Sequence, residues 1–303
     1  MRLVGLDLGG TSIKGGVASE QGEVLDRRSV DLSPDLGADG LIDRLARLAR
    51  DLGAERCVGL GAPGLFDRDR GVVLESPNLA FLEGVPLRGQ LARRLALDDS
   101  AVLLENDANA AAIGEHWIGA GRGEADFLMI TLGTGVGGGF ILGGELYAGP
   151  GGMAGEIGHV VVDPAGLPCG CGARGCLETL ASATAAQRRA NALGLPRERP
   201  GDLVLLAANA RSAPGPERDL LLEIGRDLGR GLAGVVTLLD LRLFVIGGGF
   251  GAALDVLAPG IRSGLGERSY GRRLEAVRVV RAGLGSDAGW MGAARLTLSF
   301  PAR

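Results

Sequence analysis

The chain has 303 residues, enough for about two domains, and its formal net charge of −4 argues against nucleic acid as its main partner. No run of about 18 or more apolar residues occurs, so we expect no membrane span. Residues 1–6 read Met-Arg-Leu-Val-Gly-Leu rather than a basic and then apolar leader, so we expect a cytoplasmic protein.

The first segment is expected to be a hairpin with a glycine turn. The pattern predicts strands at residues 3–7, 13–18 and 24–25, with a tight turn at residues 8–11. Backbone N–H groups of such a turn can hold phosphate oxygens, and a carboxylate at the strand end can hold Mg²⁺. The residues concerned are Asp7, Gly9, Gly10, Thr11 and Lys14, the only lysine in the chain. An ordinary Gly-Gly hairpin and a solvated lysine are the alternatives.

The same pattern returns later in the chain. Residues 127–132 predict a strand, Gly133, Thr134 and Gly135 a turn, and residues 140–142 a returning strand. The repetition predicts two similar α/β domains, each with a turn for the phosphates of ATP. A dinucleotide-binding fold would need a helix directly after this turn, and residues 140–146 instead predict a strand and turn.

Polar residues gather where a predicted strand, residues 101–104, gives way to a helix that begins at Ala110. Open α/β sheets bind ligands at such positions. The helix dipole is expected to keep Asp107 ionised, so that it can accept the proton of an attacking hydroxyl. The alternative is that Asn106 or Asp107 is only a helix cap. Asn78, in a separate loop, either binds a sugar hydroxyl or shapes the turn.

Three of the four cysteines lie in one segment, in the pattern His159-x9-Cys169-x-Cys171-x4-Cys176. Three thiolates and one imidazole fill a tetrahedral zinc shell and leave no open position, so we expect a structural zinc ion. It would fix a loop that carries Glu156 and Glu178. Disulfides or free thiols are the alternatives, and disulfides do not suit the expected cytosolic location.

The last part of the chain predicts a long helix over residues 217–239 with a core stripe. The stripe consists of Leu220, Ile224, Leu228, Leu232, Val235 and Leu239. A strand at 241–246 follows and ends in Gly247 and Gly248, which either admit an adenine ring or only turn the chain. Ser286 or Asp287 is expected to cap a final helix that extends through Leu298.

These segments together resemble the ROK family of ATP-dependent sugar kinases and sugar-responsive repressors. The motifs that carry the resemblance are Asp-Leu-Gly-Gly-Thr at 7–11, Gly-x-Gly-Ala-Pro-Gly at 59–64, Glu-Asn-Asp-Ala-Asn at 105–109, Leu-Gly-Thr-Gly-Val-Gly-Gly-Gly at 132–139, Gly-Glu-Ile-Gly-His at 155–159 with the cysteine pattern, and Gly-Gly-Gly at 247–249. The resemblance implies an α/β fold of the actin-like, hexokinase-like (ribonuclease H-like) type, with two domains and an interdomain cleft. We expect a small domain at 1–118, with a C-terminal helix at 287–303 packing on it, and a large domain at 119–286 that contains the zinc loop.

The resemblance also implies roles for single residues. Asp107 would be the catalytic base, and the sugar would be held by Asn78, Asn106, Asp107, Glu156, His159 and Glu178. The expected reaction transfers the γ-phosphoryl group of ATP, with Mg²⁺, to a hexose hydroxyl, most simply glucose to glucose 6-phosphate. Fructose, mannose, N-acetylglucosamine and N-acetylmannosamine are alternative substrates, and a non-catalytic sugar sensor is the alternative of another class. A repressor would need a DNA-binding helix-turn-helix, which the sequence does not contain. We expect a homodimer that binds sugar and ATP.

Overall fold

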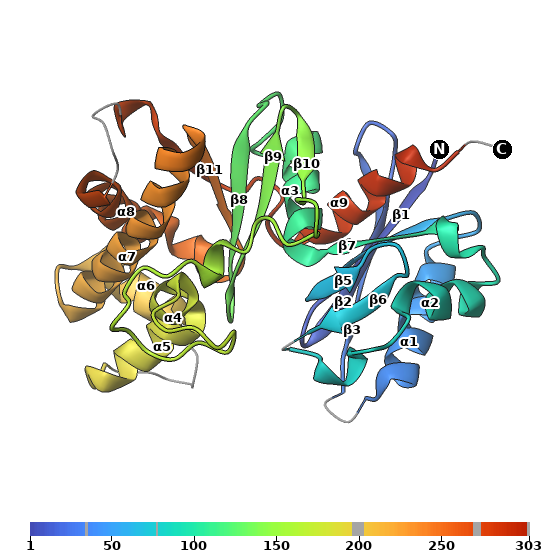
Figure 1. Ribbon diagram of the computed structural model, residues 1–303, viewed down its shortest axis with the longest axis horizontal. Helices are drawn as coiled ribbons and strands as arrows, with labels where there is room; N and C mark the ends of the chain where they lie inside the picture. Colours follow the sequence, from blue (N-terminus) through green and yellow to red (C-terminus); the bar gives the residue numbers. More distant parts are fainter. Residues whose placement is uncertain (34–35, 77, 196–202, 269–273, 302–303) are drawn as a thin grey trace. The chain divides into compact units, whose positions relative to one another are not determined.

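A computed structural model describes residues 1–33, 36–76, 78–195, 203–268 and 274–301 (Figure 1). The chain forms two compact units. Unit 1 comprises Met1–Ala125, Gly139–Ala154 and Gly283–Arg303, and unit 2 comprises Asp126–Gly138 and Gly155–Ala282. In the described part of the chain, no helix is both long enough and apolar enough to cross a membrane.

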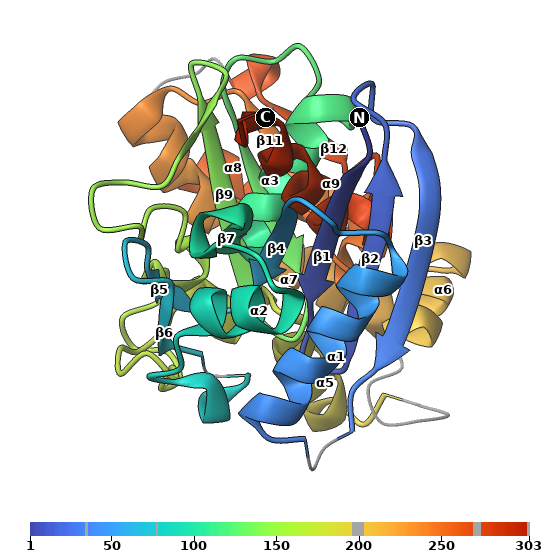
Figure 2. The ribbon, with the colours of Figure 1, turned by 90° about the vertical axis from the view of Figure 1, so that its right-hand side faces the viewer.

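A five-stranded sheet forms the centre of unit 1 (Figure 2). Its strands are β1 (Leu3–Leu8), β2 (Ser12–Ala18), β3 (Val24–Asp31), β4 (Val58–Ala62) and β7 (Val102–Asn106), in the order β3-β2-β1-β4-β7. β1, β2 and β3 pair antiparallel, whereas β1, β4 and β7 run parallel. The predicted strands are confirmed, but β3 is longer than residues 24–25. Apart from Val30, its added residues are polar and mostly exposed, as suits a strand at the edge of a sheet.

Helices cover both faces of this sheet. They are α1 (Ala38–Asp51), α2 (Leu87–Leu95), α3 (Asp107–Ile118) and α9 (Ala288–Leu296), and a small hairpin is formed by β5 (Leu65–Asp67) and β6 (Val72–Glu75). α1 and α2 lie on one face and α3 and α9 on the other (Figure 2). Because side chains alternate along a strand, Leu6 and Leu8 of β1 join the core under α1, while Asp7 faces α9. At Gly289 of α9, an added Cβ would lie 2.5 Å from Asp7 Cγ.

The start of α9 corrects one prediction. Asp287 directly precedes the helix, but its side chain makes no capping hydrogen bond. Its backbone is already helical, with φ −95° and ψ −9°, because the 3-10 turn Gly285–Asp287 leads into α9. An N-cap needs extended backbone to turn its side chain onto the first N–H groups. The Asp287 carboxylate instead accepts a hydrogen bond of 2.9 Å from Trp290 Nε1.

The second sheet has the order β10-β9-β8-β11-β12. Its strands are β8 (Phe127–Leu132), β9 (Val136–Leu142), β10 (Glu145–Tyr147), β11 (Leu243–Gly247) and β12 (Arg278–Arg281). Counted within each sheet, both follow the order third, second, first, fourth, fifth, which agrees with the predicted repetition. β9 begins earlier than predicted, because its glycines continue the strand. One of them, Gly138, lets Gly155 O lie 2.6 Å from where a Cβ would be.

Five helices complete the described part of unit 2. They are α4 (Leu177–Ala181), α5 (Ala183–Ala192), α6 (Leu203–Ser212), α7 (Pro216–Leu239) and α8 (Leu254–Arg268). The predicted long helix is confirmed as α7, and its core stripe is buried from Leu220 to Val235. Leu239 is wrong as a core residue, because it is the last residue of the helix and is 48 % exposed.

Helices α7 and α8 pack closely through glycines on both partners. An added Cβ would lie 2.2 Å from Leu257 O at Gly225 and 2.2 Å from Ile261 O at Gly229. In α8, Gly260 and Gly264 meet carbonyl oxygens of α7 in the same way. Since the obstacles are backbone atoms, no side-chain rotation can make room for a methyl group.

Gly229→Ala is therefore expected to lower the free energy of unfolding by about 1–3 kcal/mol through overpacking. Gly234 in the same helix is the matched control, because nothing lies within 4 Å of its added Cβ. Gly234→Ala is expected to raise stability by up to about 1 kcal/mol, since alanine favours helices. Urea denaturation measures both. Equal effects of the two substitutions would contradict the backbone contact.

The two compact units are not identical to the predicted domains. Residues 139–154 lie inside the predicted segment 119–286, yet they group with unit 1. The contact of Gly139 with α3 explains this, because its added Cβ would lie 2.8 Å from Ala112 Cβ. The domain boundaries 1–118, 287–303 and 119–286 stay a prediction.

Candidate active site

In unit 1, the β1–β2 turn presents the first group of predicted residues. Gly9 N donates to Ser12 O at 2.9 Å and closes the turn, and Gly10 and Thr11 are exposed at its tip. Asp7 and Lys14 are register partners on β1 and β2. The turn thus offers exposed backbone N–H groups and a hydroxyl, which suit an anion. One carboxylate and one ammonium group lie beside it.

The pKa of the Asp7 carboxyl group is unusually high. Burial raises its pKa to about 7, the neighbouring Asp107 carboxylate adds to the rise, and Lys14 opposes it. Two neighbouring, partly buried carboxyl groups disfavour a double negative charge. A divalent cation would relieve this repulsion, and carboxylate oxygens are the ligands that Mg²⁺ prefers. The residues present therefore fit the expected ion.

The raised pKa of Asp7 predicts how stability depends on pH. The pKa is about 7 in the folded protein against the ordinary 3.8, so the folded state holds this proton more tightly. The stabilising contribution is complete below pH 3.8 and is lost as the pH rises through about 7, with a limit of about 4 kcal/mol. In Mg²⁺-free buffer, Asp7→Asn should flatten the fall in unfolding free energy between pH 5 and pH 8, measured by urea denaturation. The exposed Asp69→Asn is the control, and an unchanged slope in Asp7→Asn would contradict the raised pKa.

Asn106 and Asp107 stand at the junction of β7 and α3, as predicted. Asn106 is the N-cap, because its Oδ1 accepts from Ala108 N at 2.9 Å and Asn109 N at 3.1 Å. Its Nδ2 donates to Gly64 O at 3.2 Å. The capping role offered as the alternative is thus real for Asn106. Its predicted sugar contact stays a prediction.

Asp107 is the first residue of α3, and its Oδ1 accepts from Ala108 N at 2.8 Å. Burial raises the pKa of Asp107, and the backbone hydrogen bond lowers it by less. The pKa of Asp107 therefore shifts upward despite the favourable helix terminus, because desolvation outweighs it, and the expected ionisation of this group stays a prediction. A raised pKa makes the carboxylate a stronger proton acceptor near neutral pH.

Two charged residues behind this junction were not singled out in the sequence. Glu105 is 6 % exposed, and its Oε1 accepts from Asn106 N, Asn109 Nδ2 and Arg68 Nη2. Arg68 comes from the loop after β5. The ion pair fixes the backbone from which Asn106 and Asp107 project. The spacing of Glu105 and Asn109 was visible in the sequence. No sequence pattern pointed to Arg68, because only the fold brings it next to Glu105.

Asn78 lies in unit 1 on an exposed turn, next to Pro77, which is outside the described residues. Leu79 N donates to Ser76 O at 3.0 Å and closes this turn. The buried Ser76 hydroxyl donates to Pro63 O at 3.0 Å and ties the turn to the end of β4. An exposed amide on an anchored turn suits a ligand contact, and the proposed role of Asn78 stays a prediction.

In unit 2, the predicted metal ligands converge. The ligand atoms of His159, Cys169, Cys171 and Cys176 all lie within 4.8 Å of one another. Cys169 Sγ is 3.6 Å from His159 Nδ1, and Cys171 Sγ is 3.6 Å from Cys176 Sγ. Tetrahedral zinc with ordinary bond lengths would separate a sulfur and a nitrogen ligand by about 3.6 Å and two sulfur ligands by about 3.8 Å. The residues therefore fit a structural zinc ion.

The pKa values of two of these thiols shift in opposite directions. Hydrogen bonding, chiefly from Ala173 N–H, lowers the pKa of the Cys171 thiol. Burial raises the pKa of the Cys176 thiol, so this group needs the charge of a cation to become a thiolate. His159 directs Nδ1 at the cluster, which leaves Nε2 for the sugar contact that the resemblance implies.

The two acids of the loop take different places in unit 2. Glu156 is half-buried and directly precedes the 3-10 helix Ile157–His159. Glu178 lies in the first turn of α4, directly after the ligand Cys176 and Leu177. Its Oε2 accepts from Val136 N at 3.0 Å, at the turn that joins β8 and β9. This contact with the second glycine turn was not predicted.

The remaining predicted residues belong to two turns of unit 2. Gly133 N donates to Gly135 O at 3.0 Å and closes the first, with Thr134 exposed at its tip. At the end of β11, Gly248 has a φ of +79°, and its added Cβ would lie 2.3 Å from Leu132 O. Gly248 is therefore needed for the chain to turn, and an adenine contact at Gly247 and Gly248 stays a prediction.

Comparison with known proteins decides the family. A model of the ROK family matches residues 3–299. The chain belongs to the ROK family. It is 37 % identical to a glucokinase of Thermotoga maritima, over 98 % of this chain and 97 % of that relative. It is 33 % identical to an N-acetylmannosamine kinase of Escherichia coli, over 98 % of both.

A solved structure gives the fold of this ROK protein. The ROK family glucokinase from Streptomyces griseus, determined in complex with glucose and AMPPNP, has a TM-score of 0.83 and 37 % identity, and the match covers 98 % of this chain and 99 % of that one. The predicted α/β, actin-like fold class is confirmed by this similarity.

Proposed function

We propose that this ROK protein is an ATP-dependent sugar kinase, with glucose as its preferred sugar and glucose 6-phosphate as product. The relatives named glucokinase, which match nearly the whole chain, support this proposal. The observation that carries it is the half-buried carboxylate of Asp107 at the start of α3, whose pKa is raised by desolvation. A base of this kind suits the deprotonation of an alcohol that attacks phosphorus.

In the proposed reaction, Asp107 orients the sugar hydroxyl and accepts its proton as the hydroxyl oxygen bonds to the γ-phosphorus. The bond from that phosphorus to the bridging oxygen breaks, and ADP leaves. One carboxylate oxygen, Oδ1, is held by Ala108 N–H, so Oδ2 is suited to take the proton. Positioning and electrostatics supply most of the catalysis in such transfers, and the fixed junction of β7 and α3 serves positioning.

On the nucleotide side, the proposal uses the two glycine turns. Gly9, Gly10 and Thr11 in unit 1 and Gly133, Thr134 and Gly135 in unit 2 would bind phosphate oxygens through N–H groups and hydroxyls. Mg²⁺, when bound, would neutralise part of the phosphate charge, with Asp7 as its protein partner directly or through water. Lys14 would add a positive charge, and Gly247 and Gly248 would lie against adenine.

On the sugar side, the proposal assigns hydroxyl contacts to Asn78, Asn106, Glu156, His159 and Glu178. Zinc, when bound to His159 and the three cysteines, would hold the loop that carries these acids and would leave no position for a reacting water. The similarity to an N-acetylmannosamine kinase keeps other sugars as candidates. We expect a cytoplasmic protein that forms a homodimer. Light scattering of the purified protein would test the dimer.

The deciding experiment measures ADP release from ATP and Mg²⁺ with a panel of sugars. The panel consists of glucose, fructose, mannose, N-acetylglucosamine and N-acetylmannosamine. Turnover on glucose with the highest kcat/KM supports the proposal. Preference for an N-acetylhexosamine would overturn the substrate but keep the reaction. A folded, zinc-containing protein that transfers phosphate to none of them would point to a sugar sensor.

A further inference from the structure

One segment of unit 2, residues 176–189, contacts almost every residue of the glycine turn at 133–136; we call it the support segment. Val136 N donates to Glu178 Oε2 at 3.0 Å. Ala183 N donates to Gly133 O at 2.8 Å, and Thr184 Oγ1 donates to Thr134 O at 2.7 Å. The turn is thus held by a carboxylate, a backbone N–H and a hydroxyl from α4 and α5.

These bonds fix the direction in which the turn presents its own donors. In a planar trans peptide, the C=O and the following N–H point to opposite sides, and the described residues contain no cis peptide. Because Ala183 N holds Gly133 O, Thr134 N–H points away from the support segment. Because Thr184 holds Thr134 O, Gly135 N–H points away from it as well. Two successive N–H groups directed to one side form a nest for an anion.

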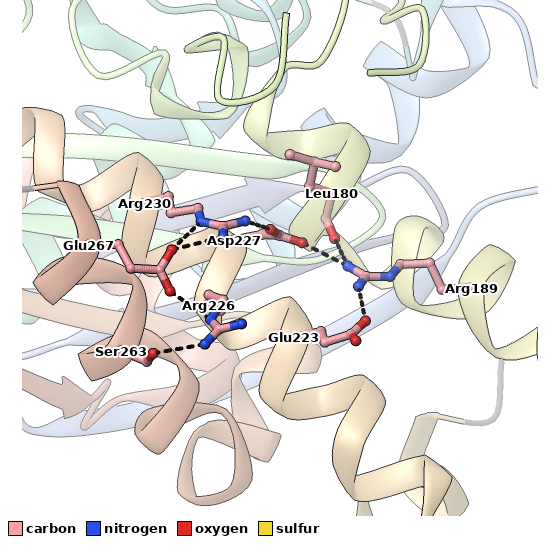
Figure 3. A network of polar contacts seen from close by, with 8 residues as sticks. All are labelled: Leu180, Arg189, Glu223, Arg226, Asp227, Arg230, Ser263 and Glu267. Atoms are coloured by element: carbon pink, nitrogen blue, oxygen red, sulfur yellow. Dashed lines mark hydrogen bonds and ion pairs between the residues drawn. The ribbon is translucent and has the colours of Figure 1, made fainter. Parts of the chain in front are cut away.

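The far end of the support segment is anchored to α7 (Figure 3). Arg189 Nη1 donates to Asp227 Oδ2 at 2.8 Å and to Leu180 O at 3.3 Å, and Nη2 bonds Glu223 Oε2 at 2.8 Å. Asp227 also pairs with Arg230, whose other partner is Glu267 of α8. The segment is therefore joined at one end to the turn and at the other to the helix pair α7–α8.

We propose that Thr184 is a positioning residue for nucleotide binding, because its hydroxyl orients the peptide that presents Gly135 N–H. This inference rests on the proposed function, in which the turn at 133–135 binds phosphate. Of the three contacts with the turn, Ala183 contributes only backbone, and Glu178 carries a proposed sugar contact. Thr184 is exposed near the start of α5, so its hydroxyl can be removed without opening the core.

The test compares Thr184→Val with wild type by calorimetry of AMPPNP binding, with Mg²⁺, and of glucose binding. Valine keeps the shape and removes one neutral hydrogen bond, so the Kd for AMPPNP and the KM for ATP should rise about three- to tenfold. The Kd for glucose should stay within about twofold of wild type. Thr184→Ser restores the hydroxyl and should restore AMPPNP affinity. Thr237→Val on α7 is the matched control, because that hydroxyl also donates to a backbone carbonyl, Ala233 O, at 2.8 Å.

The outcomes separate this inference from the proposed function. An AMPPNP affinity unchanged in Thr184→Val, an equal loss in Thr237→Val, or an equal loss of glucose affinity would overturn the inference. If Thr184→Val weakens AMPPNP binding as expected but the wild-type protein phosphorylates no sugar, the proposed function is overturned and the inference is kept. A wild type that binds no AMPPNP would overturn both.

Discussion

Replacing Asp107 with asparagine is expected to lower kcat about 10²- to 10⁴-fold, the usual contribution of a general base. Asparagine has nearly the shape of aspartate and can still accept the hydrogen bond from Ala108 N–H through its Oδ1. Its amide cannot take the proton of the sugar hydroxyl. The affinity for glucose should therefore change less than about threefold. Initial rates of ADP release and calorimetry of glucose binding give the two quantities separately.

Two further properties of this variant follow from the partial desolvation of the Asp107 carboxylate. Burial raises the pKa of Asp107, so the wild-type kcat should decline on the acidic side as the base becomes protonated, and the variant should lack that decline. Because the pKa of Asp107 is raised on folding, replacing it should also raise the free energy of unfolding of the ligand-free protein at pH 8. Such an exchange of stability for activity is common at functional sites.

Asp51→Asn is a suitable control, because Asp51 is the exposed last residue of α1 and carries the same chemical change. It should leave kcat, the pH profile and glucose affinity unchanged. Near-normal turnover of Asp107→Asn with glucose binding intact would reject Asp107 as the base. An equal loss in both variants would point to a general effect of lost negative charge.

Local patterns of the sequence were enough to predict the fold and the cluster of metal ligands. Strand, glycine turn and strand recur at β1–β2 and β8–β9, because short-range alternation and glycine-rich turns determine hairpins without help from distant residues. The cysteine and histidine spacing carried the metal cluster, since few other uses of these side chains need all four together. Asn106 and Asp107 were placed correctly at a strand end and helix start.

The long-range contacts of the site lay beyond the sequence. Glu178 lies 42 residues from Val136, and Arg68 lies 37 residues from Glu105, so no periodicity relates the partners. The direction of the Asp107 pKa shift lay beyond the sequence for a related reason. The helix terminus is a local feature that the sequence reveals, whereas the desolvation that outweighs it depends on how β7 and α3 are covered.

Removal of one metal ligand is the second large effect that we expect. Cys176 is fully buried, and it directly precedes α4, which carries Glu178. Loss of an outer-shell partner of a metal ligand already lowers metal affinity about 10- to 100-fold, so Cys176→Ser should lower zinc affinity by more than about 100-fold. Zinc content after dialysis against a chelator, measured by elemental analysis, should fall from about one ion per chain to far below one.

The loss of zinc should also weaken the surrounding structure, because metal binding is coupled to folding of the loop that supplies the ligands. We expect a lower melting temperature, faster proteolysis within residues 155–178, and a weaker affinity for glucose, since Glu156, His159 and Glu178 carry the proposed sugar contacts. Added zinc should restore wild type after stripping but should not restore the variant.

Cys57→Ser provides the matched control. Cys57 is a partly buried free thiol in unit 1 and lies outside the ligand cluster, so this variant should keep its zinc and its glucose affinity. If Cys176→Ser retains stoichiometric zinc, the four-ligand site is wrong. If it loses zinc but keeps the melting temperature, the proteolysis pattern and the glucose affinity, the metal does not hold the loop. If Cys176→Ser loses zinc, melts at a lower temperature, is cleaved faster within residues 155–178 and binds glucose more weakly, the metal has the structural role that the ligand spacing predicts. Zinc would then fix the loop that carries the acids of the proposed sugar site.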